Sequence, residues 1–128
     1  MKVLLDTQVL IWAFTQPSRL RRATADLLVD PDTAPVFSLV SIWEIAVKRP
    51  LDKPDFRVEP DLIHDTAIGR DFTQLGISVE HALRVRRLPL YHSDPFDRLL
   101  VSQAMHESMP LVTSDRALSR YDIETIRA

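Results

Sequence analysis

Cysteine is absent from all 128 residues of the chain. Its absence excludes a framework of disulfide bonds and every zinc or iron–sulfur site built on thiolates. Carboxylates and four histidines are then the side chains left to ligate a metal. Because carboxylate oxygens prefer small, hard cations, any metal bound by this chain is expected to be of that kind.

The chain also lacks a long hydrophobic run. No segment approaches the ~20 consecutive apolar residues that a membrane-spanning helix requires, so we expect no insertion into a bilayer. The apolar start of the chain is interrupted at Asp6 and Gln8, where a signal peptide would continue its hydrophobic region. We therefore predict a cytoplasmic protein.

An excess of positive charge is missing as well. Sixteen Lys and Arg residues stand against eighteen Asp and Glu residues, which gives a formal net charge of -2. This balance argues against a protein that coats nucleic acid with its whole surface. It leaves open a local basic patch.

Apolar runs typical of strands alternate along the chain with segments of helical spacing. The expected strands are residues 3–5, 35–40, 75–79, 110–113 and, near the end, 123–126. The expected helices are residues 9–14, 20–28, 41–47, 62–72, 80–87, 95–105 and 115–121. Without repeat or linker, this alternation predicts one α/β domain, residues 1–128, with helices around a mainly parallel sheet.

Acidic residues follow the expected strands. Asp6 and Asp115 come directly after two apolar runs, and Glu44 lies just beyond a third. Asp97 belongs to the segment Asp94-Pro95-Phe96-Asp97, which opens a helix. Because the carboxyl ends of parallel strands share the edge where α/β proteins bind ligands, we expect these acids to converge there.

Each acid also has an ordinary explanation at the start of a helix, where carboxylates cap backbone N–H groups. Asp6 can cap the first helix, and Glu44 can complete a capping box that Ser41 opens. Asp94 is a natural N-cap, with Asp97 as the matching first-turn acid. Taken singly, these explanations are the simpler ones, but they leave the shared edge unexplained.

Clustered carboxylates create an electrostatic problem that a cation solves. Two of them about 4 Å apart repel by ~4 kcal/mol at an effective dielectric constant of 20. Ligation by oxygen atoms alone favours Mg²⁺ or Mn²⁺, which keep several waters and suit substrates that carry phosphate. Such an ion activates a water molecule and neutralises charge on a phosphodiester, so the pattern favours a metal-dependent phosphodiesterase.

Four sequence motifs carry a family resemblance: Leu4-Leu5-Asp6-Thr7, residues 41–48 (SIWEIAVK), residues 92–100 (HSDPFDRLL) and Leu111-Val112-Thr113-Ser114-Asp115. Over residues 1–121 the chain resembles PIN-domain ribonucleases of the VapC-type toxin group, and the His-x-Asp-Pro-Phe-Asp-Arg block is the most specific motif. The acids of the family fall on Asp6, Glu44, Asp97 and Asp115, with Thr113 in the hydroxyl position before the last acid.

The resemblance implies a PIN-like three-layer α/β/α sandwich and hydrolysis of RNA with Mg²⁺ or Mn²⁺ held by Asp6, Glu44, Asp97 and Asp115. It also implies a homodimer and inhibition by a cognate VapB-like antitoxin protein. Asp94 is an additional acid, which leaves open whether Asp94 or Asp97 faces the metal. The family includes RNA-processing nucleases that are not toxins, so the role as a toxin stays a separate hypothesis.

Other side chains have two interpretations each. His92 can orient a metal-binding carboxylate or serve structure alone, and we favour the structural role. Trp12 and Trp43 lie in apolar helical runs, so we expect them in the core or a dimer contact and not as platforms for bases. Several arginines can guide a phosphate backbone or simply form a solvated surface: Arg84, Arg86, Arg87, Arg98, Arg116 and Arg120.

Three competing functions remain. A phosphatase with Asp6 as nucleophile would need a second acid two residues later, where Gln8 stands. A receiver-like signalling domain would need a phospho-acceptor aspartate after a central strand, and we find none. A non-catalytic module that binds RNA or a partner protein is the third, and the complete set of four acids argues against it.

Overall fold

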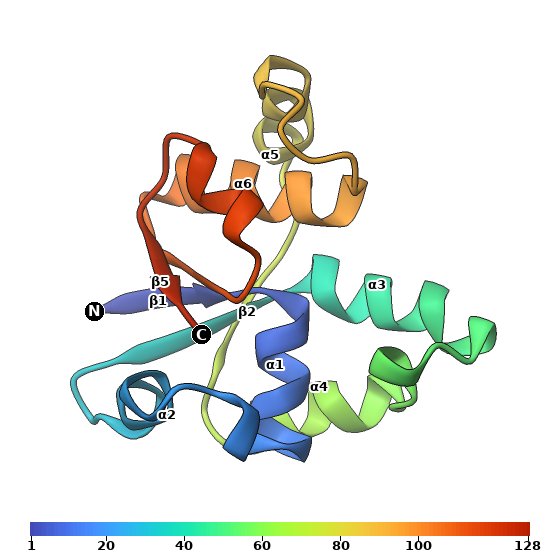
Figure 1. Ribbon diagram of the computed structural model, residues 1–128, viewed down its shortest axis with the longest axis vertical. Helices are drawn as coiled ribbons and strands as arrows, with labels where there is room; N and C mark the ends of the chain where they lie inside the picture. Colours follow the sequence, from blue (N-terminus) through green and yellow to red (C-terminus); the bar gives the residue numbers. More distant parts are fainter.

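The computed structural model describes residues 1–128, and a parallel sheet lies at its centre (Figure 1). The strands are β1 (Lys2–Leu5), β2 (Ala34–Ser38), β3 (Thr73–Leu75), β4 (Leu111–Thr113) and β5 (Thr125–Arg127). They lie in the order β3-β2-β1-β4-β5, and every neighbouring pair is parallel. The chain moves from β1 out to β3 and then returns to the other side of β1. The topological switch point, where α/β sheets bind ligands, therefore lies between β1 and β4.

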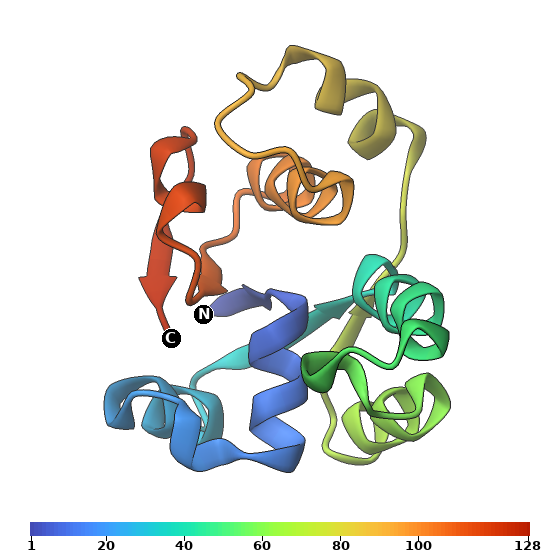
Figure 2. The same ribbon diagram turned by 45° about the vertical axis from the view of Figure 1, so that its right-hand side comes forward.

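Helices cover both faces of this sheet (Figure 2). On one face lie α1 (Thr7–Thr15), α2 (Arg22–Val29) and α4 (Pro60–Gly69), and on the other lie α5 (Val79–Arg84) and α6 (Pro95–Glu107). Helix α3 (Leu39–Lys48) contacts α1 and α4 as well as α6. The predicted three-layer α/β/α sandwich with a parallel sheet is confirmed.

The alternation of side chains along β1 builds the two halves of the core. Val3 and Leu5 are buried in the cluster that includes α1 and α4, whereas Leu4 is buried in the cluster that includes α6. Because successive strand residues point to opposite faces, a strand covered on both sides is apolar at every position. This explains the continuous apolar run in the sequence.

The start of α3 differs from the prediction. The strand ends at Ser38, whose hydroxyl caps the helix by accepting a hydrogen bond from the Val40 N–H at 3.0 Å. Ser41 lies inside the helix, and its hydroxyl oxygen accepts a hydrogen bond from Thr7 Oγ1 at 2.9 Å. The predicted capping box of Ser41 and Glu44 is therefore wrong, which frees Glu44 for another role.

Several other helices and strands begin or end at residues that differ from the prediction. The strand expected at residues 75–79 is β3 at Thr73–Leu75, because Ser78 instead caps α5 in a capping box with His81. The helix expected at residues 115–121 is the short 3₁₀ helix η5 (Arg116–Arg120), and a second one, η4 (Val85–Arg87), extends α5. The last strand pairs in parallel with β4. The remaining 3₁₀ helices are η1 (Pro17–Arg19), η2 (Arg49–Leu51) and η3 (Pro54–Phe56).

The helices of the structure are short. None combines the length and the apolar character that crossing a bilayer would require.

Candidate active site

Asp6 occupies the turn between β1 and α1, at the switch point of the sheet. One of its oxygens, Oδ1, accepts a hydrogen bond from the Val9 N–H at 2.8 Å and so caps α1. The other, Oδ2, accepts a hydrogen bond from the Thr113 hydroxyl on β4. Burial raises the pKa of Asp6 to about 6; these hydrogen bonds oppose the shift, and the negative charges of Glu44 and Asp115 add to it. Asp6 is thus a cap and also a buried carboxylate beside other acids.

Glu44 projects from α3 toward the same edge and is buried. Its Oε2 pairs with the amine of Lys48, one helical turn later. Its Oε1 is fully buried and has no hydrogen-bond partner. Since an unpaired buried polar atom costs ~1–3 kcal/mol, this oxygen is suited to accept a ligand that the protein chain does not itself provide.

Asp94 and Asp97 have different tasks at the start of α6. Asp94 is the N-cap, and its Oδ1 accepts hydrogen bonds from the Phe96 and Asp97 N–H groups at 2.8 and 3.3 Å. Asp97 lies in the first turn, and its side chain receives no hydrogen bond from the backbone. Burial raises the pKa of Asp97 to about 7, and the negative charges of Asp94, Glu44 and Asp6 add to the rise while His92 opposes it.

Asp115 follows β4 and caps η5. Its Oδ1 accepts a hydrogen bond from the Ala117 N–H at 2.9 Å, and its Oδ2 lies 2.8 Å from His92 Nε2. The backbone N–H of Asp115 donates to Thr113 Oγ1 at 3.0 Å, so the hydroxyl of Thr113 connects Asp115 to Asp6. The hydroxyl predicted from the sequence therefore lies between two of the acids.

His92 orients two of the acids, contrary to the purely structural role that we favoured. The backbone N–H of Asp94 donates to its Nδ1 at 3.0 Å, so the proton of the neutral ring resides on Nε2. Nε2 then donates to Asp115 and lies 3.4 Å from Oδ2 of Asp97. In this tautomer His92 presents a hydrogen-bond donor to the acids and offers them no metal-ligating lone pair.

All four predicted acids and Asp94 line one cavity of about 240 Å³. Lys48 and Phe56 also line this cavity, although the sequence analysis did not identify them as site residues. Burial opposes the charge of Lys48, but the hydrogen bond and charge of Glu44, together with Asp94 at 3.4 Å, raise the pKa of Lys48 above its usual value. Its spacing of four residues from Glu44 on one helix is the signal that could have identified it.

The side chains of this cavity fit a divalent cation. Five carboxylates face a single lysine amine, and two of those carboxylates have raised pKa values. The unpartnered Oε1 of Glu44 lies among them. A donor set made only of oxygens suits Mg²⁺ or Mn²⁺ and provides no thiolate for softer metals.

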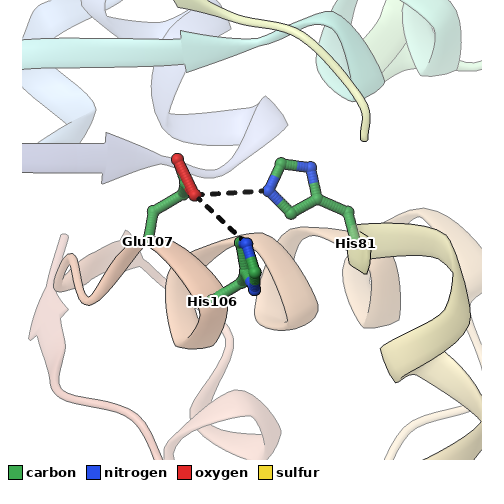
Figure 3. Close-up of side chains that lie close together, drawn as sticks. All are labelled: His81, His106 and Glu107. Carbon is green, nitrogen blue, oxygen red and sulfur yellow. Dashed lines mark ion pairs between the residues drawn. The ribbon is translucent and has the colours of Figure 1, made fainter. Parts of the chain in front are cut away.

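A second group with metal-binding residue types lies on the outer layer and does not fit an ion equally well. His81, His106 and Glu107 surround one point, with Glu107 Oε2 at 3.6 Å from Nε2 of His81 and 3.9 Å from Nε2 of His106 (Figure 3). The Ser78 N–H donates to Nδ1 of His81 at 3.0 Å, which leaves the ring proton on Nε2. His81 therefore serves the cap of α5, and its Nε2 carries a proton, forms no hydrogen bond and offers a metal no lone pair.

Arg98 is not available to RNA, so its assignment to a guiding surface is wrong. Its guanidinium is buried and donates to the carbonyl oxygens of Val85, Leu88 and Pro89 and to the Tyr121 hydroxyl, at 2.9–3.3 Å. Arg98 thus fixes the segment that leads to His92.

The two tryptophans have different surroundings. Trp12, on α1, is half-buried and packs against the core, as expected. Trp43 is 52% exposed and meets Phe96 edge-on at 4.8 Å between ring centroids. Its predicted burial in the core of the chain is therefore wrong, while a contact with another chain stays a prediction.

Comparisons with known proteins agree with this architecture. The family model described as PIN domain matches residues 3–124. The chain is similar to Ribonuclease VapC22 of Mycobacterium tuberculosis, with 29% identity over 117 residues, which covers 91% of this chain and 88% of that protein.

Solved structures share the fold at low sequence identity. A crystal structure of VapBC2 from Rickettsia felis, bound to a DNA fragment from its promoter, superposes with a TM-score of 0.74, at 16% identity and over 99% and 98% of the two chains. The crystal structure of VapBC-5 from Mycobacterium tuberculosis gives a TM-score of 0.67, at 20% identity and over 99% and 98% of the two chains.

Proposed function

This chain belongs to the PIN-domain family, and on that premise we propose that it is a metal-dependent ribonuclease and the toxin of a VapBC-type toxin–antitoxin pair. The observation that carries the proposal is the acidic cavity at the switch point, where carboxylates from separate parts of the sequence surround an unpartnered oxygen of Glu44. The relative named as a ribonuclease supports the same activity.

Asp6, Glu44, Asp97 and Asp115 are the residues that we propose to hold Mg²⁺ or Mn²⁺. When bound, such an ion would supply an activated water and neutralise negative charge on the phosphoryl oxygens. Thr113 fixes the rotamer of Asp6 by donating to Oδ2, and His92 orients Asp115 by donating to its Oδ2. These contacts keep the carboxylates in place before substrate arrives, which lowers the cost of organising them during the reaction.

Between the two acids of α6, we assign the metal to Asp97. Asp94 already uses Oδ1 for two backbone N–H groups, and its Oδ2 lies 3.4 Å from Lys48. The side chain of Asp97 receives no hydrogen bond from the backbone, and burial, together with the negative charges of Asp94, Glu44 and Asp6, raises its pKa to about 7. Asp94 accordingly supports the helix from which Asp97 projects.

The proposed partner is a VapB-like antitoxin, named after the VapBC complexes that share the fold. An apolar cavity of about 420 Å³ beside α1 and α2 suits the apolar side chains of such a partner. It is lined by Ala13, Phe14, Pro17, Leu20, Ala25, Leu28, Val29, Arg70 and Phe72. A basic side chain of the antitoxin that entered the acidic cavity would pair with the carboxylates and exclude the metal.

The oligomeric state and the cellular location of the enzyme belong to the same proposal. We propose a homodimer as its basic unit, in which the exposed Leu39, Trp43 and Val47 on α3 are available for a contact between chains. A ribonuclease that acts on cellular RNA, with a protein inhibitor, works where RNA is translated, so we propose a cytoplasmic location.

Among the alternatives, an aspartyl nucleophile at Asp6 is disfavoured. Both of its oxygens accept hydrogen bonds, from Val9 and from Thr113, and the side chain is buried. An RNA-processing nuclease without a toxin role would share the cavity but would not be inhibited by an antitoxin.

The test of the ribonuclease is the dependence of cleavage on metal. We expect excess EDTA to abolish cleavage of single-stranded RNA, and added Mg²⁺ or Mn²⁺ to restore it, because the carboxylates alone provide no activated water. The control is the Asp97→Asn variant, purified in parallel, which identifies contaminating nuclease. If the wild type cleaves RNA equally well in EDTA while the control does not cleave it, the metal-dependent mechanism is contradicted.

A further inference from the structure

A second cavity shares no lining residue with the acidic one and has a different character. It measures about 320 Å³, at the lower end of the ~300–1,000 Å³ typical of small-ligand pockets. It is lined by Arg84, Arg87, Leu88, Pro89, Tyr91, Met105, Arg120, Tyr121 and Asp122. Figure 2 shows the segment between α5 and α6, which supplies one wall, arching over α6. We call this space the Tyr91 cavity.

Aromatic and basic side chains combine in the Tyr91 cavity. Leu88 and Tyr121 are buried, whereas residue Tyr91 is 39% exposed. The guanidinium of Arg120 lies over that ring at 4.3 Å from its centroid, and the Tyr91 and Tyr121 rings are 5.1 Å apart. Arg120 thus covers one face of the Tyr91 ring, and the part of Tyr91 that stays exposed is an aromatic surface of the kind on which unpaired bases stack.

The arginines of this cavity retain their charge for a ligand. Arg84, Arg87 and Arg120 form no ion pair with a carboxylate, although the chain as a whole has a net charge of -2. Asp122 is the single acid in the lining. Positive charge is therefore concentrated in this cavity, whereas the acidic cavity is strongly negative and cannot itself attract a polyanionic substrate.

The Tyr91 cavity is linked to the acidic cavity through short connections. Tyr91 directly precedes His92, whose Nε2 donates to Asp115. The hydroxyl of Tyr121 accepts a hydrogen bond from the His92 N–H at 3.1 Å. Arg120 ends η5, the 3₁₀ helix that Asp115 caps. Residues 91–92 and η5 therefore connect the walls of the two cavities.

We propose that the Tyr91 cavity is a subsite for the RNA substrate, in which one unpaired nucleobase stacks on Tyr91 while Arg84, Arg87 and Arg120 bind the adjoining phosphates. This inference rests on the proposed ribonuclease function. It assigns the selection of single-stranded RNA to Tyr91 and the arginines, because a base that is paired in a helix must be unpaired and unstacked before it can enter, which costs free energy.

The first experiment measures stacking. Full-length protein in EDTA, which prevents cleavage, is titrated into a fluorescein-labelled single-stranded RNA, and binding is followed by anisotropy. We expect Tyr91→Leu to weaken binding about 5- to 100-fold, because leucine preserves apolar packing but has no π-face. Tyr91→Phe is the matched control and should bind within about 2-fold of the wild type, since the ring is retained.

The second experiment measures charge. Arg120→Gln should lower the salt dependence of binding by ~0.7 in the slope of log affinity against log salt, the value for one phosphate contact on a single strand. The matched control is Arg19→Gln, because Arg19 also lies over an aromatic ring, Trp12 at 4.5 Å, but in the opposite helical layer. This control should leave the slope unchanged.

Defined outcomes overturn the proposal. If the wild type and Tyr91→Leu bind RNA with equal affinity, the proposed subsite is contradicted. The same holds if Tyr91→Leu binds RNA normally but loses binding to a protein partner. If RNA binding depends on Tyr91 but the protein does not cleave RNA with any metal, the subsite is supported and the proposed ribonuclease activity is contradicted. If cleavage depends on metal but Tyr91→Leu has the same KM as the wild type, the ribonuclease activity is supported and the subsite is contradicted.

Discussion

Asp6 and Asp97 are the residues at which the proposed chemistry can be separated from folding. Asp6→Asn and Asp97→Asn should each lower the cleavage rate by at least ~100-fold, because an amide keeps the shape of the carboxylate and removes its ligand charge. The fold should survive, since asparagine also caps helices. Cleavage rates and circular dichroism of both variants check this. Loss of activity that only accompanies unfolding would mean that these acids serve the fold and not the chemistry.

The raised pKa values of these two carboxyls predict how stability depends on pH in the metal-free protein. The pKa is about 6 for Asp6 and about 7 for Asp97, against 3.8 in an unfolded chain. Between about pH 4 and 7 the folded state therefore binds more protons than the unfolded state, and stability falls as pH rises. Burial of the two carboxyls, with repulsion from the neighbouring carboxylates, raises these pKa values and thereby makes stability fall as pH rises.

The Asp97→Asn variant isolates this contribution, because it lacks the titrating group. In EDTA, its melting temperature should exceed that of the wild type by a margin that grows from about pH 4 to pH 7, in line with the pKa of about 7 for Asp97. Added Mg²⁺ should raise the melting temperature of the wild type and have little effect on the variant. A margin that stayed constant with pH would contradict the raised pKa of Asp97 and the burial and charge repulsion that cause it.

Single residues differed in how far the sequence could predict them. The acids were predictable, because Asp6 and Asp115 follow strands whose apolar character marks them in the sequence. Arg98 was not, because nothing local distinguishes an arginine that binds backbone carbonyl groups from one that faces solvent. The donor role of His92 depends on the backbone N–H of Asp94 and on Asp115, so it needed the three-dimensional structure.

At the scale of an element, the start of α6 gives a test of which acid binds metal. Pro95 occupies the first turn and needs no N–H partner there, so Asp94 caps the helix and Asp97 projects from it. Asp94→Ser should preserve the cap and substantial metal-dependent activity, whereas Asp94→Ala should cost ~1 kcal/mol of stability. Asp97→Ser should be folded and inactive.

Melting temperature, metal affinity and cleavage of these three variants decide the assignment together. The pair Asp94→Ser and Asp97→Ser makes the same chemical change at two positions of one helical turn, so each is the control of the other. An Asp94→Ser protein that folds fully but cannot bind metal would exchange the roles of the two acids.

Elements were predictable in kind and less so in their limits. The sequence favoured Ser41 as a cap because Glu44 follows at the spacing of a capping box, yet Ser38 caps α3, and Glu44 lies in the acidic cavity. The strand expected at residues 75–79 ends at Leu75, because edge strand β3 has exposed residues and little apolar pattern. Local signals compete at such positions, and tertiary contacts decide between them.

For the whole molecule, the parallel sheet explains why acids far apart in the sequence meet. The order of strands puts β1 beside β4, so the residues after them, Asp6 and Asp115, lie at one switch point. Helices α3 and α6 then bring Glu44 and Asp97 to the same cavity. The alternation of strands and helices predicted this convergence, whereas the apolar cavity on α1 and α2 depends on packing that no sequence pattern specifies.

That apolar cavity gives the prediction at the largest scale, because it tests the toxin role separately from catalysis. Val29 lines it and is 81% exposed, so Val29→Asp disturbs no core packing. The introduced charge should weaken binding of a VapB-like antitoxin by at least ~10-fold, since an unpaired carboxylate against an apolar partner is costly to desolvate. Metal-dependent RNA cleavage should be unchanged, because the substitution lies outside the acidic cavity.

The matched control is Val79→Asp, which places the same charge at an exposed valine of α5, in the opposite helical layer. It should leave antitoxin binding as in the wild type. Calorimetric titration of the antitoxin and a cleavage assay with and without it measure both effects on the same proteins. If Val29→Asp remained fully inhibited, the antitoxin would bind another surface; if no VapB-like protein inhibited the wild type either, the chain would be an RNA-processing nuclease, because the acidic cavity serves both functions equally.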